Sequence, residues 1–150
     1  MSPELDARLC ARYPKIFADR HRSVQESCMG RGMDCDDGWF NLIDVLCGAL
    51  QYESDHNQAP QVLAAQVKEK FGTLRFYVRG ANDQQRGMIR MAEAMSARLC
   101  EVCGRPGGVF ASETGYVSTR CAAHVEPDSV ARSEFLRRMA AQIHASGDTP

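Results

Sequence analysis

The sequence lacks the features that direct a chain into or across a membrane. Its first residues show no basic segment followed by an apolar one, and no uninterrupted apolar run approaches bilayer-spanning length. We therefore expect a cytoplasmic protein without membrane contact. An excess of charge is also lacking, because 18 Lys and Arg against 19 Asp and Glu give a net charge of −1. A dedicated DNA-binding domain is usually more basic overall.

Common catalytic fingerprints are absent as well. The sequence contains no G-x-S-x-G nucleophile elbow, no H-E-x-x-H, no P-loop and no Rossmann glycine pattern. Seven cysteines, an odd number without a secretion signal, favour a reducing compartment and metal ligation over disulfides. The 150 residues suffice for one domain, or for a small domain with an appendage.

What the chain does contain is a four-ligand metal pattern. Two residues separate Cys100 from Cys103, and two residues separate Cys121 from His124. Zn²⁺ takes four tetrahedral nitrogen and sulfur ligands, and a two-residue gap lets one tight turn direct both side chains to one point. Gly104 suits such a turn because glycine adopts a positive φ without strain. The protein supplies all four ligands, so the pattern predicts one structural Zn²⁺ ion rather than a catalytic one.

The segment between the two ligand pairs predicts a β-hairpin. Two short β-like runs, 109–111 and 116–119, are divided by a Thr114-Gly115 turn. Cys121 and His124 would then be neighbours on one face of a helix. This order of knuckle, hairpin and helix resembles a treble-clef zinc finger. The alternatives are four unrelated buried residues, or a CxxC redox pair, although no thioredoxin-like βαβ pattern surrounds the cysteines.

We expect an α+β fold, with an α+β domain over residues 1–99 and a zinc finger plus a long terminal helix over 100–150. Apolar periodicity predicts helices after Ser2-Pro3, over 39–51, over 82–99 and from Pro127 to about residue 145. Asn82 or Asp83 should cap the 82–99 helix. The apolar side of the last helix would consist of Phe135, Leu136, Met139, Ala140 and Ile143. The 39–51 helix is apolar around most of its circumference and should form the core. Asp36 or Asp37 should cap that helix, since the segment around them does not match an EF-hand loop. A polar connection should follow it to residue 61.

Two runs of alternating apolar and polar residues, joined at Phe71-Gly72, predict a β-hairpin over 62–79 with one buried face. Ala65, Val67 and Phe71 belong to the apolar set of the first run. The exposed face would carry Lys68, Lys70, Arg75, Tyr77 and Arg79. This face can bind nucleic acid, with Tyr77 stacking on a base, or an acidic partner, or it can be a solvated surface.

The block 66–77, QVKEKFGTLRFY, has Gly38-Trp39-Phe40 ahead of it and Cys-x-x-Cys-Gly behind it. In this combination the chain resembles a group of small phage- and bacterium-encoded proteins that end in a zinc finger. The resemblance covers roughly residues 36–124. It implies a cytosolic protein of a mobile element, and it carries over no activity and no site residues.

Three functions follow from these features. The first, which we expect, is a non-enzymatic, zinc-stabilised interaction protein that binds a bacterial or phage protein, as an inhibitor of host defence or a transcriptional regulator. The second is nucleic-acid binding through the basic hairpin face and the zinc finger. The third is an HNH-like nuclease, but His124 is assigned to zinc, and Asp55-His56-Asn57 lacks the expected ββα-metal setting. Cys10, Cys28, Cys35 and Cys47 remain without an assigned role, and a nucleophilic Cys28 or Cys35 would need a neighbouring base.

Overall fold

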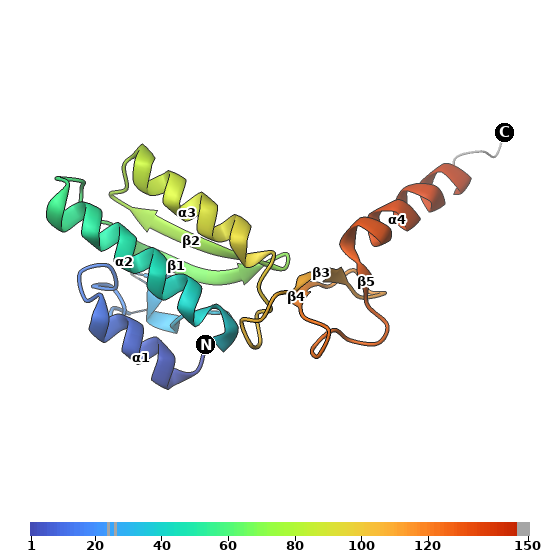
Figure 1. Ribbon diagram of the computed structural model, residues 1–150, viewed down its shortest axis with the longest axis horizontal. Coiled ribbons are helices and arrows are strands. Elements are labelled where there is room, and N and C mark those ends of the chain that lie inside the picture. The colour runs from blue at the N-terminus through green and yellow to red at the C-terminus, as the bar shows by residue number, and fades with distance from the viewer. Residues whose placement is uncertain (24, 26, 147–150) are drawn as a thin grey trace.

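The computed structural model describes residues 1–23, 25 and 27–146, with side chains through residue 142. Within this part of the chain the fold is α+β, as the sequence predicts, with four α-helices and two small antiparallel sheets (Figure 1). The helices are α1 (Pro3–Arg12), α2 (Phe40–His56), α3 (Asp83–Ser96) and α4 (Arg132–Ser146). None of these helices is long and apolar enough to cross a membrane.

The predicted hairpin consists of β1 (Leu63–Lys70) and β2 (Thr73–Arg79). Phe71 and Gly72 connect the strands with φ angles of 54° and 79°. A type I′ turn, whose twist matches that of the flanking strands, requires a positive φ at both central residues. The chain therefore places a bulky residue in a conformation that glycine usually takes, and its ring lies in solvent with 63% of its surface exposed.

A β-bulge between Ala64 and Gln66 changes which residues of β1 face inward. Val62 and Ala64 are buried, whereas Ala65 is only half-buried. The assignment of Ala65 and Phe71 to the buried face was therefore wrong. Strict alternation along β1 does not allow for the extra residue of the bulge, which turns Ala65 away from the core, and Phe71 lies in the turn rather than in a strand. The assignment of Val67 is confirmed.

The core lies between the hairpin and the helices that cover it, and α2 and α3 lie side by side over the strands (Figure 1). Trp39 and Ile43 are fully buried here, and the Phe17 ring meets the Phe76 ring edge-on at 6.4 Å between centroids. The central helix extends beyond its predicted end at residue 51 and reaches His56. Its last turns pack against α3, where Glu53 is buried and Gln85 donates to the Ser54 hydroxyl at 3.3 Å, so polar composition there did not mean a loop.

Of the two predicted helix caps, that of α3 is confirmed and that of α2 is wrong. Asn82 caps α3 in a capping box with Gln85, as expected for an Asn at this position. Neither Asp36 nor Asp37 makes a side-chain cap bond to α2. The Asp37 carboxylate instead accepts a hydrogen bond from the Ser2 backbone at 2.6 Å, which ties the start of α1 to the start of α2.

The C-terminal sheet has the strand order β4-β3-β5, formed by β3 (Gly108–Ala111), β4 (Val117–Arg120) and β5 (Val130–Ala131). The predicted helix start at Pro127 is wrong, because β5 precedes α4 and pairs with β3. From β5 the helix α4 extends away from the rest of the molecule (Figure 1). Ile143, predicted to lie on its apolar side, is outside the side chains that the structure describes.

Candidate metal centre

The structure brings the four predicted ligands together at one point. One ligand atom from each of Cys100, Cys103, Cys121 and His124 lies within 4.8 Å of the other three. The Cys103 and Cys121 sulfurs are 3.7 Å apart, and Nδ1 of His124 lies 3.5 Å from the Cys100 sulfur and 3.3 Å from that of Cys121. Three thiol sulfurs and one imidazole nitrogen at these separations can hold a metal ion.

The first ligand pair lies in a tight turn between α3 and β3. The Gly104 N–H donates to the Cys100 carbonyl at 2.7 Å, and Gly104 has the expected positive φ, 72°. Burial raises the pKa of the Cys100 thiol, but backbone N–H groups of Cys121, Cys103 and Val102 donate to its sulfur and lower the pKa to about 6. The loop thus stabilises the thiolate, which is the form that binds a metal.

The second ligand pair also lies in a turn, where a helix was expected. The N–H groups of His124 and Val125 both donate to the Cys121 carbonyl at 2.9 Å, and no helix includes these residues. Cys121 directly follows β4, so the hairpin fixes its position. The ligand pairs are therefore two similar turns at the ends of one hairpin. A two-residue gap suits either a turn or a helix, which is why spacing alone did not distinguish them.

The first ligand turn packs directly on the segment that precedes α2. The Gly38 N–H donates to the Glu101 carbonyl at 2.7 Å, and the Trp39 indole donates to the Leu99 carbonyl at 2.9 Å. A Cβ on Gly38 would stand 2.5 Å from the Gly104 nitrogen and closer still to the carbonyl oxygens of Cys100 and Glu101. Only a glycine fits here, and sequence reasoning missed its role because the contact joins residues more than 60 positions apart.

A buried ion pair supports the same contact. Glu101, 5% exposed, binds the Arg120 guanidinium at 3.0 Å and accepts the Asp36 backbone N–H at 3.2 Å. Burial raises the pKa of the Glu101 carboxyl, and Arg120 and the Asp36 N–H oppose that shift. Thr119 of β4 donates to the carbonyl of Gly72 in the β1–β2 turn. The part of the chain from residue 100 onward, here called the metal-binding unit, is thus joined both to the loop before α2 and to the tip of the first hairpin.

The predicted basic face is only partly available. Arg79 forms an ion pair with buried Asp19, which also pairs with Arg22, so this residue serves the fold. Lys70 lies at the end of the hairpin with its ammonium 5.3 Å from the Phe71 ring.

Lys68 and Arg75 are register partners, so both side chains lie on the same face as Tyr77. The Lys68 ammonium is 6.0 Å from the Tyr77 ring centroid, at the outer limit of a cation–π contact. Arg75 donates to Thr73 and to the Leu74 carbonyl, and it has no acidic partner among the described residues. The face therefore retains two cations beside an exposed aromatic ring.

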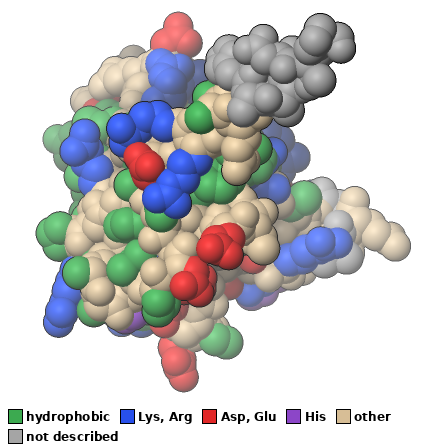
Figure 2. Space-filling view, turned by 90° about the vertical axis from the view of Figure 1, so that its right-hand side faces the viewer, with side chains coloured by type: hydrophobic (Ala, Val, Ile, Leu, Met, Phe, Trp, Pro, Cys, Tyr) green, Lys and Arg blue, Asp and Glu red, His purple; other side chains and the backbone are tan. Residues whose placement is uncertain are grey.

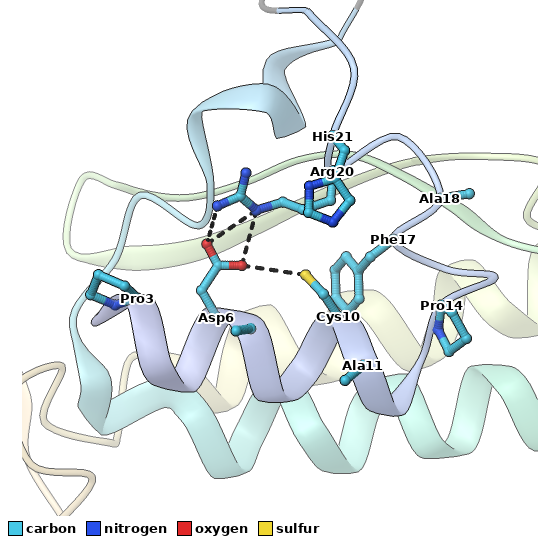
Figure 3. Close-up of a pocket in the computed structure, with 10 residues that line it drawn as sticks. Pro3, Asp6, Cys10, Ala11, Pro14, Phe17, Ala18, Arg20 and His21 are labelled. Atoms are coloured by element: carbon cyan, nitrogen blue, oxygen red, sulfur yellow. Dashed lines mark hydrogen bonds and ion pairs between the residues drawn. The ribbon is translucent and has the colours of Figure 1, made fainter.

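The remaining cysteines show no sign of nucleophilic activation. Cys10 lines a cavity of about 410 Å³, in which Arg20 holds the Asp6 carboxylate at 2.8 Å (Figure 3). Burial and the hydrogen bond to Asp6 raise the pKa of Cys10 to about 12, and burial raises that of Cys35 to about 12. Burial likewise raises the pKa of Cys47. These three thiols are protonated at neutral pH, while Cys28 is exposed.

Comparison with known proteins found no matching family model, no matching curated protein and no matching solved structure.

Proposed function

We propose that this chain is a non-enzymatic interaction protein that one structural Zn²⁺ stabilises. Zinc fits the donor set, because three thiolates and one imidazole suit a borderline-soft ion that prefers four tetrahedral ligands. With zinc about 2.3 Å from sulfur and about 2.0 Å from nitrogen, a tetrahedron separates two sulfurs by about 3.8 Å and a sulfur from a nitrogen by about 3.5 Å. The closest separations in the cluster, 3.7, 3.5 and 3.3 Å, approach these values.

We further propose that the metal-binding unit is a treble-clef-like finger. The order of ligand turn, β3–β4 hairpin, second ligand pair and C-terminal helix supports this classification. The unit differs from a treble clef in one respect: the second ligand pair lies in a turn, and the strand β5 stands between this turn and the helix. The proposal excludes catalysis at the metal, because a site with four protein ligands has no open position for a substrate.

The exposure of α4 is the observation that supports a binding function most directly. Among the described residues α4 contacts β3 and β5, and its side chains from Phe135 to Gln142 line a hollow together with Ser112 and Glu113. Leu136 is 54% exposed and Met139 43% exposed, although both belong to the apolar side. Figure 2 views this end of the molecule, where hydrophobic side chains stand exposed among charged ones. A helix of 15 residues is only marginally stable alone in water, so a partner that covers its apolar side would stabilise it.

We propose a protein as this partner, a bacterial or phage protein in the setting that the sequence resemblance implies. An amphipathic helix that lies in an apolar groove is a common mode of protein recognition. Regulation or inhibition of that partner would follow from occupying its groove, and it requires no chemistry from this chain.

The test is capture of a defined partner from the bacterial host with wild-type protein and with Leu136→Glu. We expect one protein to co-purify at stoichiometric yield with wild-type protein and to be lost with the variant. Ala141→Glu is the matched control, because it adds the same single negative charge to the exposed helix surface opposite the apolar side and leaves that side intact. Retention of the same partner by Leu136→Glu would exclude α4 as the binding element.

A second candidate, nucleic-acid binding, is favoured by one specific observation. Lys68 and Arg75 lie beside the exposed Tyr77 ring on the open face of the hairpin. A ring on which bases stack, with cations nearby for phosphates, is the usual composition of a single-strand binding surface.

A further inference from the structure

A groove between β2 and α3 extends this open face. It has a volume of about 250 Å³, and its lining includes Tyr77 from the strand and Arg86 and Arg90 from the helix. Arg86 and Arg90 are four residues apart, so their side chains lie one above the other on the same side of α3.

The side chains of α3 that contact the edge of β2 fix this arrangement. The Glu93 carboxylate accepts the Phe76 backbone N–H at 2.9 Å, and the Ser96 hydroxyl accepts that of Leu74 at 2.8 Å. These bonds hold the helix against the strand edge, and Ile89 is buried beneath. Arg86 and Arg90 are thereby carried on a rigid wall of the groove.

The guanidinium groups of Arg86 and Arg90 are available to bind an anion. Neither guanidinium forms an ion pair or a hydrogen bond with another described residue, in contrast to Arg79, which is paired with Asp19. The Glu93 carboxylate lies outside the lining of the groove and is engaged with the Phe76 N–H. The charged residues among those that line the groove are therefore the two arginines.

Tyr77 stands between two sets of cations. On one side are Lys68 and Arg75 of the hairpin face, and on the other are Arg86 and Arg90 of the groove. The ring itself is 43% exposed. In a single nucleic-acid strand a phosphate lies on either side of each base, so a ring flanked by cations on both sides matches one base and its two neighbouring phosphates. An acidic polypeptide would use the cations but would gain nothing specific from the ring.

We propose that the β2–α3 groove is a binding site for single-stranded nucleic acid, in which a base stacks on Tyr77 and the adjoining phosphates bind Arg86 and Arg90 on one side and Lys68 and Arg75 on the other. This inference deepens the second candidate function and depends on it. It is independent of the α4 surface and of the metal.

The test is fluorescence anisotropy of a labelled 12-nucleotide oligothymidylate over a range of salt concentrations. We expect Arg86→Ala with Arg90→Ala to weaken binding by about tenfold or more at low salt. The slope of log K against log[salt] should fall by about 0.7, because the two arginines bind the phosphate on one side of the base and each lost phosphate contact on a single strand removes about 0.7. Tyr77→Leu should weaken binding by about fivefold or more at every salt concentration, since stacking does not release counterions.

The matched control is Arg137→Ala with Arg138→Ala, which removes the same charge from α4. An equal loss in this control and in the groove variant would mean diffuse attraction and overturn the site. Wild-type affinity in the groove variant, with loss in Lys68→Ala with Arg75→Ala, would overturn the groove and keep the second candidate function. No binding of the oligonucleotide by wild-type protein would overturn both.

Two further probes separate other ligands. Polyglutamate that competes as well as unlabelled oligothymidylate, together with unchanged binding by Tyr77→Leu, would assign the cations to an acidic protein and overturn the proposal. Tighter binding of a duplex of the same length would exclude stacking on Tyr77. Metal content and melting temperature, measured for each variant, show that the exposed substitutions leave the fold intact.

Discussion

The two parts of the molecule are stabilised by different means. From Leu9 to Ala92, buried apolar side chains of three helices and the first hairpin form one continuous cluster. In the described residues from 100 onward the buried apolar residues are Cys100, Ala111 and Cys121, and two of these are metal ligands. The second part therefore buries almost no hydrocarbon that is free to form a core.

The magnitudes decide what holds the second part together. Burial of a methyl group such as that of Ala111 contributes only about 0.8 kcal/mol. Zinc ligation in small domains contributes about 10 kcal/mol or more at neutral pH. With the proposed zinc bound, the metal-binding unit would depend on its ion for folding, whereas the first part can fold on apolar burial. One chain would then combine a hydrophobic core with a ligand-held appendage.

The largest expected effect breaks the second part alone. Cys121→Ser should abolish stoichiometric zinc binding and cost the metal-binding unit about 10 kcal/mol, because a neutral hydroxyl replaces a thiolate ligand. Hydrogen exchange should show lost protection in β3 and β4 and retained protection in β1 and β2. Metal analysis and exchange on the same sample measure both results.

Cys28→Ser is the control for this prediction, because Cys28 is exposed and outside the ligand cluster. It should keep one zinc per chain and the wild-type exchange pattern. If Cys121→Ser also kept its zinc and its protection in β3 and β4, the assignment of the ligands would be wrong and so would the contrast between the two parts.

A smaller effect is expected within the first part, at its buried ion pair. Asp6 is 5% exposed, and its carboxylate accepts hydrogen bonds from Arg20 and from the Cys10 thiol. Arg20→Leu leaves a buried carboxylate without its cation, which should lower the free energy of unfolding by about 3–5 kcal/mol at pH 7. Arg12→Leu is the control, because the exposed Arg12–Asp44 pair should contribute at most about 1 kcal/mol.

The same pair predicts a pH dependence of stability. Burial by itself would raise the pKa of Asp6, but the hydrogen bonds and charge of Arg20 lower it below its ordinary value. A carboxyl with a lowered pKa contributes stability above its unfolded pKa of about 4, and this contribution is lost as the pH falls through the folded value. Urea unfolding should therefore show the difference between wild type and Arg20→Leu shrinking below pH 4. A difference that stays constant there would show that Arg20 acts by packing.

What could be predicted from the sequence was local. Spacing identified the four metal ligands, alternation located the hairpin, and Asn82 marked the start of α3. Each of these signals lies within a few consecutive residues, where chain geometry determines the outcome.

What could not be predicted depends on contacts between distant segments. The last turns of α2 contact Gln85 of α3, which donates to Ser54, and the close fit of Gly38 relies on Cys100 and Gly104. The groove beside Tyr77 exists because Glu93 and Ser96 bind the edge of β2. The bulge at Ala64 adds a residue that simple alternation cannot represent.

The smallest expected effect tests how strongly the two parts are coupled. Gly38→Ala would force a methyl group into the backbone of the first ligand turn, which should cost about 1–3 kcal/mol. Trp39 lies beside this contact and donates to Leu99, so its fluorescence reports the first part, while a metal-sensitive dye reports zinc release from the second. In wild type the two signals should change together on heating, because the interface joins the parts. In Gly38→Ala zinc release should move to a lower temperature than the Trp39 transition.

Gly87→Ala is the opposite control, since nothing lies within 4 Å of a Cβ there and the change should stabilise α3 by up to about 1 kcal/mol. Coincident transitions in Gly38→Ala at the wild-type temperature would show that the parts do not need this contact.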